Sequence, residues 1–319
     1  MPAEGHDGTP QSSITLLGPQ RRPRVDTVLR SLGLHGARAA IVNAGWRERE
    51  PEDGLLVSLS GGNTVNLRLW HRMQEVWEAD PEFAAADRRR RMVLEEMQDL
   101  YVVALDHVIG ALRAMRDRVP RSQHVQDVAL ADAEQIMQQI DQRHLDRVNE
   151  VHADFWEQWP PHERRPVQLL RERVSSELAD AEVILVPGGH VGVLVGAMHL
   201  FNIAPQLRVP IVAWGAGAMA LTDRVVLFHD RAAHGPSVSE VFTSGLGLVK
   251  DTVAFPGARE RLDLGNHRRM GVLARRFAPA HCLLLNDRAR VDILPGGGLP
   301  DDAPVLTPDG HQTVMEHAR

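Results

Sequence analysis

The chain has 319 residues, of which 43% are hydrophobic and 24% are charged, and its formal net charge is −6. This composition is typical of a globular protein with a sizeable core, and it excludes collagen-like and disordered classes. Without a basic excess or an apolar stretch long enough to cross a bilayer, we expect neither nucleic acid nor a membrane as a partner.

The beginning of the chain and its cysteine content indicate the compartment. Residues 1–12 are polar and predict a disordered tail that is neither a signal peptide nor an anchor. The single cysteine, Cys282, leaves no intrachain disulfide, so we expect a cytoplasmic protein. Nearly all basic residues are arginine, which is typical of a GC-rich bacterial genome.

The first structured part alternates between strand and helix. Residues 13–20 (SITLLGPQ) and 38–43 predict buried strands, and residues 25–34 predict a helix between them. This order favours a parallel sheet with crossover helices. The stretch SGGNTVNL at residues 60–67 predicts a strand-to-helix turn in which Asn63 or Thr64 caps the next helix; the alternative is a second glycine loop near a pocket.

Residues 64–178 predict an all-helical insertion. Two long helices, at residues 81–119 and 125–159, are expected to form an antiparallel hairpin with shorter helices at residues 64–78 and 166–178. We interpret the arginine run at residues 88–91, and the pair Asp141 and His144, as parts of a solvated helix surface. A di-metal site in a helical bundle uses a carboxylate and a histidine three residues apart on each of two facing helices, and the opposite helix has no second pair of this kind. We therefore expect no metal and no cofactor. The apolar faces of the insertion are candidates for homodimerisation.

The third part returns to strands that end in glycines. Residues 182–189 (EVILVPGG) and 209–214 predict strands that turn directly into helices, and residues 225–230, 251–255, 282–287 and 290–294 predict later strands. The predicted fold class is α/β, with a doubly wound, mostly parallel sheet built from residues 13–63 and 179–319. Ligands bind such sheets at the carboxyl ends of strands, so Gly188, Gly189, His190, Gly215 and Ala216 are candidate ligand-binding residues.

The segment at residues 210–221 (PIVAWGAGAMAL) has the small residues that a nucleophile elbow requires. Its AWGAGA stretch resembles the G-W-S-A-G-A elbow of the dipeptidase E and cyanophycinase serine peptidases, members of the class I glutamine amidotransferase-like superfamily. The stretches ILVPGGH at residues 184–190 and GLGLVKDTVAFPGARERL at residues 245–262 are similar to other segments of that family, in the same order. The resemblance covers most of residues 179–294 and implies a flavodoxin-like three-layer sandwich.

The resemblance implies a serine nucleophile and a base histidine, and this chain carries neither. Gly215 occupies the serine position, and residues 254–258, where the histidine is expected, are Ala-Phe-Pro-Gly-Ala. A serine hydrolase needs both groups, so serine hydrolysis is not expected.

A replacement for the missing nucleophile or base must come from another residue. Cys282 begins an apolar strand and is interpreted as a small buried hydrophobe. His190, His229 and Asp230 follow predicted strands and are candidate catalytic or pocket residues, with His234 close behind; the alternatives are a loop-packing histidine and a turn capped by Asp230. Trp214 is a candidate ligand-binding residue, although a core role is more common for a tryptophan before an elbow.

Two functional hypotheses follow. In the first, the protein is catalytically degenerate and binds a small amino-acid-like or peptide ligand, or a partner protein. In the second, it is a repurposed enzyme in which His190, His229 and Asp230 perform acid–base chemistry on an amino-acid-like or peptide substrate without a covalent intermediate.

Overall fold

The computed structural model describes residues 13–20, 25–229 and 238–315. It shows an α/β fold around a six-stranded sheet with the order β10-β1-β5-β4-β2-β3. All neighbours in this sheet are parallel except the edge strand β10, which is antiparallel to β1. The strands are β1 (Ile14–Leu17), β2 (Ala39–Ile41), β3 (Thr64–Asn66), β4 (Val183–Val186), β5 (Ile211–Trp214) and β10 (Arg290–Asp292).

The central strands are apolar at every position because both faces of the sheet are covered. Along β4 and β5, alternate side chains enter one of two hydrophobic clusters. One cluster joins the sheet to α1 (Val25–Ser31) and α2 (Gly54–Ser60), and the other joins it to α3 (Leu69–Ala79), α7 (Val191–Leu200) and α8 (Ala216–Leu221). Strands buried on both faces read as continuous apolar runs, which is why they were predictable.

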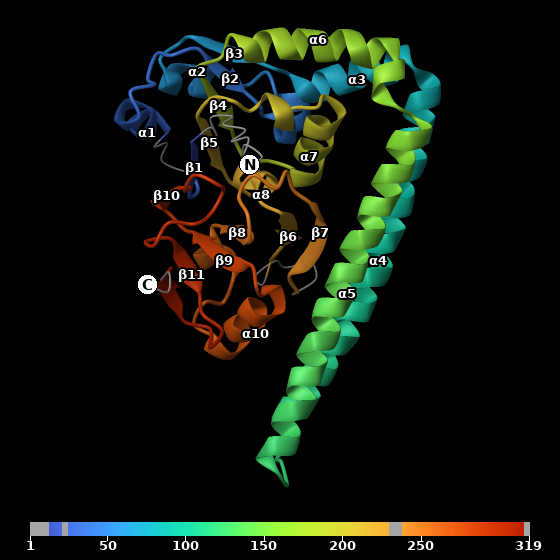
Figure 1. Cartoon of the computed structure of the whole chain (residues 1–319), viewed down its shortest axis with the longest axis vertical. Coiled ribbons are helices and arrows are strands. Elements are labelled where there is room, and N and C mark those ends of the chain that lie inside the picture. Colours follow the sequence, from blue (N-terminus) through green and yellow to red (C-terminus); the bar gives the residue numbers. More distant parts are fainter. Residues whose placement is uncertain (1–12, 21–24, 230–237, 316–319) are drawn as a thin grey trace, which may run out of the picture.

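The long helices form a hairpin that extends well beyond the rest of the molecule (Figure 1). Helix α4 (Pro81–Asp117) begins at the predicted residue, and Asp80 caps it, since the Asp80 side chain accepts a hydrogen bond from the Phe83 N–H. Helix α5 (Gln123–Gln158) packs along it, and α6 (Arg165–Ala179) returns the chain to β4 after the 3-10 turn η2 (Pro161–Glu163). No helix among the described residues is long and apolar enough to cross a membrane.

The predicted strand-to-helix turn at residues 60–67 is wrong on both sides. Residues 54–60 form helix α2, which buries Leu56 and ends at Gly61 with φ 100°. Thr64–Asn66 then form strand β3, parallel to β2, so neither Asn63 nor Thr64 caps a helix, and the helix that was expected from residue 64 begins at Leu69. The main sheet therefore extends past the predicted domain boundary at residue 63.

The prediction of a solvated surface inside the hairpin also fails. Asp141 and His144 are buried, with 1% and 5% of their surface exposed. The Asp141 carboxylate accepts hydrogen bonds from Arg276 and Tyr101, and the His144 ring stacks on Tyr101 with 4.0 Å between ring centroids. Of the arginine run, only Arg90 is mostly buried, over the rings of Phe155 and Trp156. Its three neighbours in the run are exposed, as predicted. The buried side chains are polar parts of a helix interface.

The C-terminal part forms separate, smaller sheets. The four-stranded sheet has the order β12-β11-β9-β8, in which β8 and β9 are parallel, and β6 and β7 form an antiparallel pair. These later strands were expected in the doubly wound sheet, and only β10 joins it. The elements are β6 (Arg224–Leu227), β7 (Glu240–Ser244), β8 (Thr252–Pro256), α9 (Ala258–Arg261), α10 (His267–Phe277), β9 (His281–Leu285), β11 (Pro304–Leu306) and β12 (Gln312–Val314), with 3-10 turns η1 (Ala44–Arg49) and η3 (Ala204–Gln206) earlier in the chain.

Candidate functional site

Three loops meet at the carboxyl ends of the neighbouring strands β2, β4 and β5. The His190 N–H donates a hydrogen bond to the Gly45 carbonyl oxygen, at 2.7 Å. A Cβ atom added to Gly189 would lie 2.4 Å from the same oxygen, and one added to Gly215 would lie 3.1 Å from the Gly188 Cα. We call Gly45, Gly188, Gly189, His190 and Gly215 the three-loop site. The structure therefore brings together the glycines that were predicted from the sequence, and adds Gly45.

The turn at Gly215 has the geometry that an elbow requires. Gly215 joins β5 to α8 with φ 58° and ψ −130°, a conformation that side chains other than glycine adopt only under strain. Two residues later, a Cβ on Gly217 would lie 2.0 Å from the Val186 carbonyl oxygen, so the helix approaches β4 too closely for any larger residue. The small residues of the segment are thus required sterically, but Gly215 supplies no nucleophilic atom.

His190 is used as a helix cap in this site. Its Nδ1 accepts a hydrogen bond from the Val193 N–H at 3.2 Å, at the beginning of α7. This bond requires an unprotonated Nδ1, which places a ring proton on Nε2. The side chain is exposed, and its Nε2 forms no hydrogen bond within the described part of the chain. His190 can therefore donate a hydrogen bond to a ligand from Nε2.

Trp214 and Ala216 flank the elbow and are both buried, each with 8% exposure. Trp214 belongs to the hydrophobic cluster that includes Val25 and Leu29 of α1, with Trp46 packed against it. This is the core position that is common for a tryptophan before an elbow, and it leaves little of the ring for a ligand.

His229 lies apart from the expected arrangement. It follows β6, whose described partner is the antiparallel strand β7, so it is not at the carboxyl end of the parallel sheet. Burial lowers the pKa of His229, and the charge of Arg261 acts in the same direction. Asp230 and His234 lie outside the described residues.

The expected position of the base histidine and the only cysteine of the sequence are both buried in apolar surroundings. Residues 254–256 lie within the buried strand β8, followed by Gly257 with φ 68°. Cys282 is 1% exposed, and burial raises the pKa of its thiol to about 12, so at neutral pH it stays a protonated thiol. Neither position supplies a base or a nucleophile.

Sequence reasoning missed a carboxylate–histidine pair close to these loops. Glu50, which is fully buried directly after η1, accepts hydrogen bonds from the N–H groups of Trp70 and His71 at the beginning of α3. Its Oε2 also lies 2.9 Å from the His71 Nδ1, and the His71 side chain is 36% exposed. Glu50 and His71 are 21 residues apart, so no local sequence pattern predicts their contact. They meet because strand β3, which lies between them in the sequence, joins the sheet beside β2.

Helix α3 packs on both η1 and α7, the elements that carry Gly45 and follow His190. A carboxylate that holds Nδ1 of a histidine orients the ring and supports its use as a base through Nε2. The described residues contain no group of three or more His, Cys, Asp or Glu side chains arranged to hold a metal ion.

No protein-family model and no curated protein sequence matches this chain. Among solved structures, it is similar to the crystal structure of a peptidase from an acI-B1 Actinobacterium, with a TM-score of 0.43 and 14% sequence identity over 96% of this chain and 95% of that one. A likeness this distant carries no argument about the site or its chemistry.

Proposed function

We propose that this protein is a catalytically degenerate serine-peptidase-like protein of the class I glutamine amidotransferase-like superfamily, which binds a small amino-acid-like or peptide ligand at the three-loop site. The observation that carries the proposal is Gly215, whose φ of 58° and ψ of −130° provide an elbow without a nucleophile. The apolar residues 254–258 add the absence of a base at the position where the resemblance implies one.

A binding role fits the surroundings of Gly215. Gly189 and Gly215 have positive φ and no side chain, so the three loops can approach one another closely. The exposed His190 adds a donor at Nε2, next to the same glycines. Such a site offers polar contacts without a reactive side chain.

The proposal includes a domain organisation. We propose a flavodoxin-like α/β domain with a helical insertion at residues 67–178. The sequence predicts the boundary at residue 63, and β3 moves it because this strand belongs to the main sheet. A second copy of the chain is the proposed partner of the apolar outer face of the hairpin, supported by Leu100 and Val103, which are 65% and 55% exposed.

Gly215→Ser tests the proposal directly. The wild-type protein should not react with a fluorophosphonate probe at this position, and Gly215→Ser should be labelled slowly without hydrolysing aspartyl dipeptides, because no base activates the new hydroxyl. Gly215→Ala is the matched control, since it adds the same Cβ at 3.1 Å from the Gly188 Cα without an oxygen. Dipeptide hydrolysis by the wild-type protein would contradict the proposal.

One observation favours a second candidate function, a repurposed enzyme that uses acid–base chemistry on an amino-acid-like or peptide substrate. The Glu50 carboxylate orients His71 through a 2.9 Å contact and leaves Nε2 available as a base for water. If this candidate is correct, His71→Gln abolishes turnover while leaving ligand affinity within about threefold. An equal loss in His71→Gln and in the exposed control His107→Gln would contradict it.

A further inference from the structure

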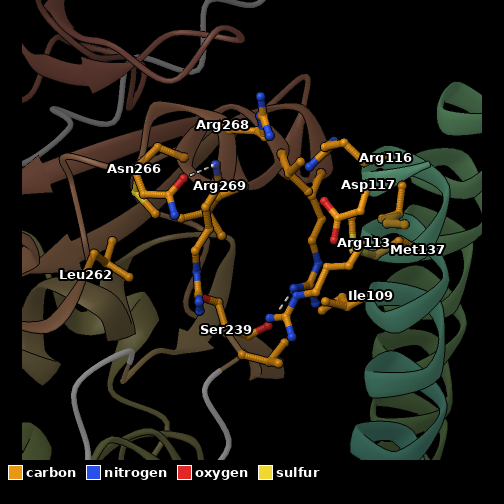
Figure 2. Close-up of a pocket in the computed structure, with 16 residues that line it drawn as sticks. Ile109, Arg113, Arg116, Asp117, Met137, Ser239, Leu262, Asn266, Arg268 and Arg269 are labelled. Atoms are coloured by element: carbon orange, nitrogen blue, oxygen red, sulfur yellow. Dashed lines mark hydrogen bonds between the residues drawn. The ribbon is translucent and has the colours of Figure 1, made fainter. Parts of the chain in front are cut away.

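A cavity of about 380 Å³ lies between the helical hairpin and the C-terminal part, and no residue of the three-loop site lines it. Figure 2 shows side chains from α4 on one side of the opening and side chains from the beginning of α10 on the other. The apolar part of its wall includes Ile109, Leu112, Met137 and Leu273. This volume is in the range of sites for small metabolites.

The charged residues of the wall are almost all arginine. Arg113, Arg116, Arg268, Arg269 and Arg276 line the cavity, and Asp117 is the only carboxylate among its lining residues. So unequal a distribution is unusual in a chain that carries more acidic than basic residues overall, with 42 Asp and Glu against 36 Lys and Arg.

Neighbouring acids compensate only part of this positive charge. Arg276 is paired with Asp141, but Arg116 lies 3.6 Å from a Glu134 carboxylate oxygen that Arg275 also contacts, at 2.6 Å. Arg113 forms no ion pair with any described residue, and the same holds for Arg268, which lies at the cavity edge. Two guanidinium groups at the opening thus have their donors available.

The arginines are close enough to affect one another. Burial lowers the pKa of Arg116, and the charges of Arg275 and Arg268 act in the same direction, although Glu134 opposes them. A doubly charged anion in the cavity would relieve this repulsion, and the guanidinium fork matches the oxygens of a phosphate.

The beginning of α10 adds to the positive electrostatic potential of the cavity. Asn266 is the N-cap of this eleven-residue helix and lines the cavity, with no acidic residue in the first turn. The positive end of the helix dipole therefore lies beside the arginines, where it favours an anion.

We propose that this cavity binds a small molecule carrying a phosphate group, with the phosphate at Arg113, Arg116 and Arg268 and an apolar portion against Leu112 and Met137. Such a ligand would join the hairpin to α10. It would then stabilise the folded chain, because it binds across two elements that separate on unfolding.

Isothermal titration of the full-length protein with sodium pyrophosphate, at fixed ionic strength, tests the proposal, and a parallel titration with succinate tests the class of anion. The double variant Arg113→Gln/Arg268→Gln removes both guanidinium groups that form no ion pair among the described residues, and it should raise the dissociation constant for pyrophosphate about tenfold or more. Arg88→Gln/Arg89→Gln is the matched control, since it removes two exposed charges from α4 outside the cavity. Asp117→Asn should strengthen binding, because it removes the lining carboxylate.

The expected result is saturable pyrophosphate binding at one site per chain, with a higher thermal midpoint. Binding should be weaker in the cavity variant, unchanged in its control and tighter in Asp117→Asn. Three outcomes would overturn the proposal. These are no saturable binding of pyrophosphate, equal losses in the cavity variant and its control, and tighter binding of succinate than of pyrophosphate.

Discussion

Asp141→Ala removes the carboxylate that holds the hairpin against the C-terminal part of the chain. Its two oxygens lie 2.6 Å and 2.7 Å from Nε and Nη2 of Arg276, and the Tyr101 hydroxyl donates to one of them at 2.7 Å. Arg276 comes from α10 and its guanidinium also donates to the Ser239 carbonyl oxygen at 2.6 Å. One buried group therefore connects α4, α5 and α10.

The expected loss of unfolding free energy follows from the burial of both Asp141 and Arg276. Asp141 is 1% exposed and Arg276 is 4% exposed, so the variant leaves a cation out of water without a counter-charge. Burial alone lowers the pKa of Arg276, but Asp141 outweighs that effect and the net pKa is raised. Removing one partner of such a pair costs about 3–5 kcal/mol of unfolding free energy, whereas replacing both by apolar residues is often neutral. Asp141→Leu combined with Arg276→Met should therefore recover most of the loss.

Urea unfolding followed by circular dichroism measures the unfolding free energy of the single and the double variant. Asp146→Ala, at an exposed position of the same helix, is the control and should change the unfolding free energy by less than about 0.5 kcal/mol. A cost below about 1 kcal/mol for Asp141→Ala, or a double variant no more stable than the single one, would refute the role assigned to this buried pair.

Three further predictions concern other parts of the chain. Burial lowers the pKa of His152 to about 4, with Arg90 and His199 acting in the same direction. Because this lies below the ordinary 6.5, stability should be complete above pH 6.5 and fall by up to about 3 kcal/mol as the pH drops to about 4; His152→Gln should flatten that loss in pH-dependent unfolding. Gly217→Ala should prevent a stable fold or lower the thermal midpoint sharply in calorimetry, since its Cβ would lie 2.0 Å from a β4 carbonyl oxygen; an unchanged midpoint would contradict the close packing. Leu100→Glu should abolish dimers in light scattering if the hairpin face pairs two copies, and unchanged dimers would exclude that face.

Local patterns in the sequence predicted much of the scaffold. The strands at β4 and β5 are continuous apolar runs, and the glycines after them identified the loops that meet at the site. Helix α4 begins at the predicted residue 81, directly after its cap Asp80. These features depend on nearest neighbours and on steric demands that a single segment reveals.

Pairings between distant segments were not predictable in this way. The charged residues Asp141 and His144 looked like a solvated surface, because the partner that buries them, Arg276, lies over 130 residues away. The pair Glu50 and His71 also depends on tertiary structure, since β3 must join the sheet before α3 begins. The arginine cavity has the same origin, because its walls come from two parts of the chain.

The most direct test of the central claim is to incubate the purified protein with a bacterial metabolite extract and to compare, by mass spectrometry, the molecules that leave solution with those that the denatured protein releases. If the three-loop site binds the ligand, the denatured protein releases an unchanged amino-acid-like or peptide molecule in stoichiometric amount. His190→Asn should lose that release, because it can still cap α7 but lacks the exposed Nε2 donor. Catalytic depletion of one metabolite with the appearance of a product would contradict the binding role.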